Sequence, residues 1–145
     1  MGHGIVARYA LDGTELHTWT FRNICSGIDF DAASHAAYVA TSDSNEIVDV
    51  QGTVLVSNLS TPTALSFYSE SSRLYIADPG RRATFTVDTR SHKPIMTEFL
   101  SRPLKSPYGM ALILSDRMAV AVYGASSILV FSSKGALLFR LPPND

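Results

Sequence analysis

The chain has 145 residues, of which 46% are hydrophobic and 17% are charged, and its formal net charge is −1. This composition is too apolar for a disordered segment and fits a single globular domain. The single cysteine, Cys25, excludes an internal disulfide and a metal site built from several thiolates. No apolar run approaches the roughly 20 residues that cross a bilayer, and the first residues lack the pattern of a signal peptide. We therefore expect no membrane partner and, by default, a cytoplasmic location.

Short strands alternate with turns along the chain. The strands are rich in aromatic and β-branched residues, and clusters of Ser, Asp, Asn, Gly and Pro separate them. In chain order, the clearest strands are 5–9, 28–30, 37–40, 74–77, 118–123 and 127–131. No segment of helical length carries apolar residues at three-and-four spacing together with caps. The sequence therefore predicts an all-β fold with almost no helix.

One motif recurs three times along the chain. Each copy begins at a small anchor residue (Gly27, Ala64 or Gly109), and a second apolar run follows at the same offset in all three, starting at Tyr38, Tyr75 or Val120. A further apolar residue follows at a second constant offset, at Val48, Phe85 or Val130. The distances between successive anchors bracket the length of a four-stranded propeller blade. Each copy therefore predicts four antiparallel strands, with the anchor on the innermost strand. In the second copy these strands are expected at 63–67, 73–77, 84–87 and 95–99.

The repeats divide the chain into one propeller segment, 1–145, with a half blade at 4–22 and blades at 24–60, 61–103 and 104–142. The half blade is expected because strand 5–9 and the turn Asp12-Gly13 match strand 128–131 and the turn Lys134-Gly135. Three and a half blades do not close a ring, since propellers need about four to eight. The chain is therefore expected to be either a fragment of a larger propeller or a part whose uncovered strand edges and blade faces associate with a second copy or with a partner protein.

The second copy carries a recognisable signature. Tyr75-Ile-Ala-Asp-Pro-Gly-Arg-Arg82, leading into Thr84-Phe-Thr-Val87, resembles the NHL repeat, in which an aromatic-Val-Ala-Asp strand precedes a turn and an amphipathic strand. Tyr38 to Asn45 is a second match, and the third copy has Tyr123-Gly-Ala125 in place of the turn that contains Asp. The resemblance implies an NHL-like β-propeller, related to six-bladed YVTN-type and gluconolactonase-like propellers. Because the sequence also lacks a serine-hydrolase elbow and a Gly-rich phosphate loop, we expect an interaction or scaffold module with no catalytic residue and no cofactor.

A binding surface on such a module would lie on the loops between its strands. The candidate residues for it are Asp78, Arg81, Arg82 and Tyr108. The three anchors are expected to serve the fold, together with the turn formers Pro79, Gly80 and Gly124. Charge is uneven along the chain, because residues 1–72 carry 8 acids and 2 bases whereas residues 73–145 carry 5 acids and 10 bases. This asymmetry favours pairing between copies or docking to a charged partner.

A metal-dependent hydrolase is the first alternative function. Hydrolase propellers that resemble this chain hold calcium or zinc in the central channel through Glu, Asn and Asp side chains. At the mouths of the expected inner strands the candidate ligand is Asp29, with Ser26, Thr63 and Ser106 nearby. Asp43 and Asn45 are candidate calcium ligands in a separate turn between two strands. Calcium is the cofactor under this alternative. Because half a ring supplies half a site, we expect no catalysis by this chain alone.

RNA binding is the second alternative function. Some NHL domains bind RNA across a basic face, and attraction to phosphate requires such a face. The basic stretch consists of Arg81, Arg82, Arg90, Lys93, Arg102 and Lys105, with aromatic residues between them. Those aromatic residues fall where strand packing needs them, and the pI near 6.4 does not suit a dedicated RNA binder. Nucleic acid is therefore not the expected partner.

Overall fold

The fold is described from a computed structural model that covers residues 3–100, 103–113 and 116–141. Within these residues the chain forms short strands joined by turns and two single-turn 3₁₀ helices, which confirms the all-β prediction. The strands are β1 (Gly4–Tyr9), β2 (Glu15–Phe21), β3 (Cys25–Asp31), β4 (Ala36–Thr41), β5 (Glu46–Asp49), β6 (Val54–Val56), β7 (Ala64–Tyr68), β8 (Arg73–Asp78), β9 (Ala83–Asp88), β10 (Thr97–Glu98), β11 (Pro107–Ile113), β12 (Arg117–Val122), β13 (Ser127–Ser132) and β14 (Leu137–Leu141). The 3₁₀ helices are η1 (Ser69–Ser71) and η2 (Tyr123–Ala125).

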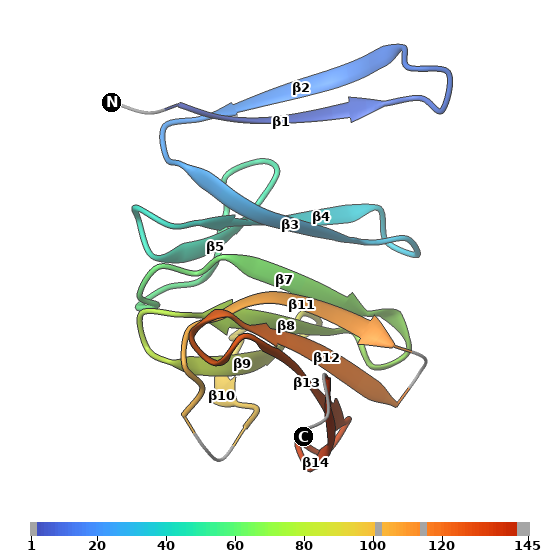
Figure 1. Ribbon diagram of the computed structural model, residues 1–145. Coiled ribbons are helices and arrows are strands. Elements are labelled where there is room, and N and C mark those ends of the chain that lie inside the picture. The colour runs from blue at the N-terminus through green and yellow to red at the C-terminus, as the bar shows by residue number, and fades with distance from the viewer. Residues whose placement is uncertain (1–2, 101–102, 114–115, 142–145) are drawn as a thin grey trace.

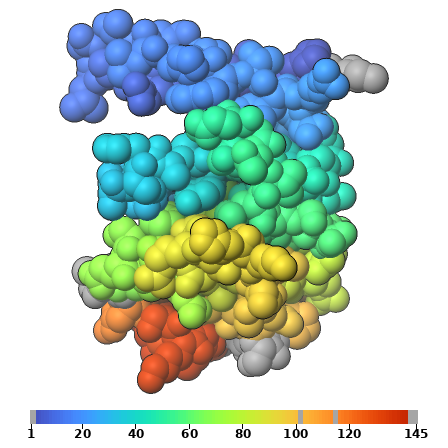
Figure 2. Space-filling view, turned by 180° about the vertical axis from the view of Figure 1, so that it is seen from behind, coloured from blue at the N-terminus to red at the C-terminus, as the bar shows by residue number. Residues whose placement is uncertain are grey.

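The strands form four antiparallel sheets. One sheet has two strands, β1-β2, and the other three have four strands each, ordered β3-β4-β5-β6, β7-β8-β9-β10 and β11-β12-β13-β14. The sheets stack in chain order (Figure 1), and Figure 2 shows the same order from the opposite side. They fall inside the segments expected from the repeats, whose boundaries stay predictions. The outermost strand of the third sheet is shorter than expected, since β10 covers only Thr97–Glu98.

The first strands of the four-stranded sheets lie beside one another, with β7 between β3 and β11. Side-chain hydrogen bonds join them: the Ser26 hydroxyl donates to the Pro62 carbonyl at 2.6 Å, and the Thr63 hydroxyl donates to the Tyr108 carbonyl at 3.1 Å. A Cβ atom on Gly27 would stand 2.6 Å from the carbonyl oxygen of Thr63. The structure thus confirms that this anchor lies where the innermost strands crowd together.

Three apolar clusters fill the spaces between successive sheets. Val39 packs with Val6 and Trp19 between the first two sheets, whereas its neighbour Tyr38 packs in the next cluster, between the second and third sheets. The third cluster, between the last two sheets, includes Tyr75. Adjacent residues belong to different clusters because side chains alternate across a strand. Each sheet is therefore covered on both faces only when it has a neighbour on both sides.

The hairpin β11-β12 of the third repeat is one residue shorter than the corresponding hairpins β3-β4 and β7-β8 of the first two repeats. In the first copy Ile28 pairs with Val39, and the second copy has the same spacing between its paired residues. In the third copy Met110 pairs with Val120, which lies one position closer along the chain. Val120 therefore faces the preceding sheet, as Val39 does, and not the following sheet, as Tyr38 does. The offset predicted for the third copy is wrong by one residue, because the connection between β11 and β12 is shorter.

The two turn glycines expected to serve the fold, Gly80 and Gly124, do so through close approach, whereas the anchor Gly109 has room for a Cβ atom. A Cβ atom on Gly80 would stand 2.1 Å from the Ser60 carbonyl oxygen, and one on Gly124 would stand 3.1 Å from the Lys105 carbonyl oxygen. In both places the turn between the second and third strands of a sheet presses on the linker that enters the same sheet. The Pro79 carbonyl accepts the Arg82 N–H at 3.0 Å and closes the first of these turns. No helix among the described residues has the length and apolar character needed to span a membrane.

Candidate interaction surface

An apolar row crosses the second sheet on the side that faces the third. Ala40 pairs with Ile47, and Ile47 pairs with Val56, so the three side chains lie in line across β4, β5 and β6. Their exposed fractions are 0%, 0% and 6%, because side chains of the third sheet pack over them. The row shows how this chain covers an apolar blade face when another sheet follows.

The corresponding row on the last sheet is open. Ala121 pairs with Ile128, and Ile128 pairs with Leu141, in line across β12, β13 and β14. Ala121 is exposed, and the exposed fractions of Ile128 and Leu141 are 43% and 46%. We call the face that these three residues mark the outward face, since it points away from the third sheet. It presents the same kind of apolar row that a following sheet covers elsewhere.

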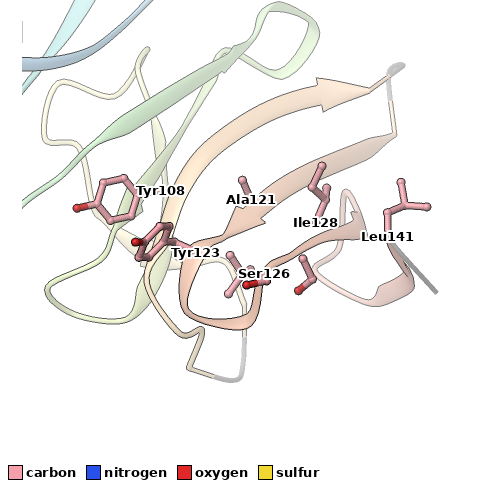
Figure 3. A pocket seen from close by; sticks show the side chains of 8 residues that line it. Tyr108, Ala121, Tyr123, Ser126, Ile128 and Leu141 are labelled. Atoms are coloured by element: carbon pink, nitrogen blue, oxygen red, sulfur yellow. The ribbon is translucent and has the colours of Figure 1, made fainter. Parts of the chain in front are cut away.

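The outward face contains a shallow hollow of about 700 Å³. Figure 3 shows Tyr108 and Tyr123 at one end and Ile128 and Leu141 at the other. The two tyrosine rings are 5.8 Å apart, and their exposed fractions are 55% and 79%. Exposed aromatic rings beside an aliphatic floor are typical of protein interaction sites.

The four predicted surface residues lie in two places. Tyr108 lines the hollow on the outward face, whereas Asp78 ends β8 and Arg81 and Arg82 lie in the turn that leads to β9. Ala121, Ile128 and Leu141 are not among the surface residues predicted from the sequence. The available signal was the expectation of uncovered blade faces, which does not by itself identify the residues.

Asp78 is completely buried, contrary to its expected place on an exposed surface. Its carboxylate accepts the Ser60 N–H at 2.7 Å and the Arg81 N–H at 3.3 Å. Burial raises the pKa of this carboxyl group, and the two hydrogen bonds and the Arg81 charge partly oppose that increase. Asp78 therefore fixes the linker between the second and third sheets and has no carboxylate surface to offer a partner.

Arg81 and Arg82 are exposed, but Arg81 is engaged within the chain. Its guanidinium donates to the Asn58 carbonyl, lies 4.0 Å from the Asp78 carboxylate and sits 5.8 Å from the centre of the Phe85 ring. Arg82 has a φ of 56°, which places it at the left-handed position of the turn. Both residues thus help to shape the turn, and their role in binding stays a prediction.

The candidate metal ligands are occupied by backbone groups. Asp29 on β3 accepts the N–H of Phe67 on β7 at 2.6 Å and so joins two sheets. Asp43 accepts the Ile24 N–H at 2.9 Å, and Asn45 accepts the Thr61 N–H at 2.8 Å. Within residues 3–100, 103–113 and 116–141, no three His, Cys, Asp or Glu side chains gather as a metal site would require. What these three residues do in the structure is hold linkers and neighbouring strands.

Two residues of the basic stretch, Arg81 and Arg90, make local contacts within the chain. Arg90 forms an ion pair with Asp88 at 3.1 Å, and this contact and the adjacent carboxylate charge raise the pKa of the Arg90 guanidinium. Arg81 has the internal contacts given above, and Arg102 lies outside the described residues. These contacts do not favour a continuous basic face for nucleic acid.

No protein-family model matches the chain, and no curated protein matches it. Several solved structures do resemble the chain. The chain resembles a nidogen/laminin complex structure with a TM-score of 0.74 and 11% identity, covering 97% of this chain and 63% of that one. It resembles a catalytically inactive virginiamycin B lyase from Staphylococcus aureus with a TM-score of 0.72 and 17% identity, covering 97% and 50%.

A third similar structure is the hydrazine synthase of Kuenenia stuttgartiensis, with a TM-score of 0.65 and 16% identity, covering 80% of this chain and 35% of that one. The chain thus spans less than two thirds of each of these proteins. At such low identities the likeness establishes the fold and carries no activity across. Together with the four-stranded antiparallel sheets, it shows a partial β-propeller.

Proposed function

We propose that this chain is a non-catalytic interaction module of NHL-like propeller type, and that a second copy of the chain covers its outward face. The observation that carries the proposal is the row Ala121, Ile128 and Leu141, which is open on the last sheet although the corresponding row of the second sheet is buried. Covering such a face removes apolar surface from water, at roughly 25 cal/mol per Å². The type assignment is supported by the signature on β8 and the turn that follows it.

Charge supports a head-to-tail arrangement. The hairpin β1-β2, at the opposite end of the stack from the outward face (Figure 1), carries Asp12 and Glu15 against Arg8, whereas the last sheet and its turns carry Arg117, Lys134 and Arg140 against Asp116. Pairing of two last sheets would bring together two segments that each carry a net positive charge. The acidic half of a second copy is therefore the better complement to the basic last sheet.

The test is the native mass of purified chain, measured by light scattering over a range of concentrations. We expect a dimer or larger species that Ile128→Glu converts to monomer, because a carboxylate cannot be buried unpaired in an apolar interface. Ile95→Glu is the matched control, since Ile95 is 79% exposed and lies outside the outward face. A wild-type chain that stays monomeric and folded at all concentrations would refute the proposal.

The hydrolase and RNA-binding alternatives have less support. The oxygens of Asp29 and Asp43 hold backbone N–H groups, and the arginines Arg81 and Arg90 pair within the chain. Calcium-dependent melting would favour the hydrolase, and salt-sensitive retention of RNA would favour the RNA binder.

A further inference from the structure

The two-stranded sheet corresponds to the outer half of a blade. Its hairpin turn has the same hydrogen bonds as the turns after β5 and β13, with the glycine at a positive φ in each: Gly13 at 87°, Gly52 at 87° and Gly135 at 80°. β1 and β2 thus occupy the third and fourth strand positions. Among the described residues β1 pairs with β2 alone, so its inner edge has no neighbouring strand.

The exposed fractions of side chains beside that edge show that the space next to it is open. Ile28 on β3 faces the two-stranded sheet, and its equivalent on β7 is Leu65. Leu65 is only 6% exposed, whereas Ile28 is 52% exposed. The same side chain position is buried where the preceding sheet has inner strands and open where it has none.

A second pair of equivalents gives the same result and identifies what covers the position. Phe67 on β7 is half-buried and stacks on Tyr38 of the preceding sheet, with ring centres 5.8 Å apart. Its equivalent on β3 is Phe30, which is 62% exposed. The group that Phe30 lacks is an aromatic side chain on a second strand.

These features enclose a groove of about 310 Å³ between β1 and β3. The residues that line it are Ile5, Val6, Ala7, Cys25, Ser26, Gly27, Ile28 and Val39. It is continuous with the apolar cluster between the first two sheets, because Val6 and Val39 belong to both. An occupant would therefore extend an interface that the chain has already built.

We propose that this groove binds a β-hairpin of a partner protein, whose second strand pairs with the free edge of β1. At the second strand position two of the three four-stranded sheets use Tyr38-Val39-Ala40 and Tyr75-Ile76-Ala77, and the last sheet, whose equivalent residues are Ala119-Val120-Ala121, lacks the aromatic residue. The occupant accordingly carries an aromatic residue, a β-branched residue and alanine in succession, with the aromatic ring on Phe30. Strand addition supplies backbone hydrogen bonds, and alternate side chains supply specificity. This site goes beyond the proposed self-association, which uses the outward face.

The probe is a synthetic peptide with the sequence of residues 63–78, which contains one inner hairpin of this chain. Fluorescence anisotropy of the labelled peptide should show saturable binding to the full chain. Binding should weaken at least about tenfold in the Ile28→Glu chain, and for a peptide with Tyr75→Ser. The Ile95→Glu chain, with an exposed isoleucine changed away from the groove, should bind as the wild type does.

Cys25 gives a second readout, because this single thiol lines the groove. Saturating peptide should slow its alkylation by a maleimide, and the Tyr75→Ser peptide should not. Absence of saturable binding would overturn the proposal. So would binding that Ile128→Glu abolishes while Cys25 stays reactive, since the peptide would then occupy the outward face. A wild-type chain that is monomeric but binds the peptide at the groove would refute the self-association alone.

Discussion

Two anchor glycines occupy equivalent positions in different surroundings, which allows one contact to be isolated. Gly27 and Gly109 both lie on the first strand of a sheet and pair with an alanine of the second strand. A Cβ atom on Gly27 would stand 2.6 Å from the Thr63 carbonyl oxygen, whereas one on Gly109 would meet only the Ala121 Cβ, at 3.5 Å. We therefore predict that Gly27→Ala destabilises the fold and Gly109→Ala does not.

The expected change in the free energy of unfolding is the sum of two contributions. Replacing glycine by alanine in a strand reduces the entropy of the unfolded chain and stabilises by about 0.4–1 kcal/mol at either position. Only Gly27→Ala adds a backbone clash, for which overpacking costs of about 1–3 kcal/mol are typical. The free energies of unfolding of the two variants should therefore differ only by the cost of the clash. This difference corresponds to roughly 1 M in the midpoint of urea unfolding.

The assay is urea unfolding followed by circular dichroism, with both substitutions made in the Ile128→Glu chain. That background keeps self-association from adding to the measured free energy of unfolding. Gly109→Ala is the matched control, since it changes the same residue type at the equivalent position. Equal midpoints for the two variants would refute the contact between β3 and β7 on which the prediction rests.

Two predictions concern carboxylates that accept backbone hydrogen bonds from a neighbouring segment. Asp29→Ala should lower the free energy of unfolding by about 1–2 kcal/mol, because the Phe67 N–H loses its acceptor, and calcium should leave the melting temperature of both chains unchanged. A calcium-dependent increase in the wild type alone would instead make Asp29 a ligand. Burial raises the pKa of Asp78, so the native state keeps this proton to a higher pH than the unfolded chain does. The contribution of Asp78 to stability should therefore be greatest below the unfolded value of 3.8 and fall as pH rises through the folded pKa. Unfolding free energies of wild type and Asp78→Asn, compared across acidic pH, check this, and a difference that grows with pH in favour of the wild type would contradict it.

Strand positions could be predicted from sequence because their signals are local. Alternating apolar residues and turn clusters predicted β4, β8, β12 and β13 to within about two residues at each end, a usual margin for element boundaries. The register between neighbouring strands was harder to predict from the sequence. A single residue missing between β11 and β12 moves Val120 to the other face, since one step along a strand reverses the side chain.

The roles of polar residues could not be predicted in the same way. Asp78 was expected on a binding surface, but its carboxylate accepts a hydrogen bond from the Ser60 N–H. Ser60 lies 18 residues away in the chain, and the two residues come into contact only when the second and third sheets pack together. The same holds for Asp29, whose acceptor role depends on Phe67 in the next sheet. A carboxylate in or at the end of a strand looks the same in sequence whether it binds a ligand or accepts a hydrogen bond from a neighbouring segment, and only the tertiary contacts distinguish the two roles.

The two apolar sites lie at different ends of the stack, which leads to a prediction about their independence. Ile28 faces the two-stranded sheet, and Ile128 lies on the outward face of the last one (Figure 1). Substitutions at distant positions with no shared partner are expected to have additive effects. The double variant Ile28→Glu/Ile128→Glu should therefore show the peptide affinity of the first single variant and the native mass of the second. If Ile28→Glu alone converted the chain to monomer, the partner copy would have to reach the groove, and the head-to-tail contact would extend from the outward face of one copy to β1 and β3 of the other.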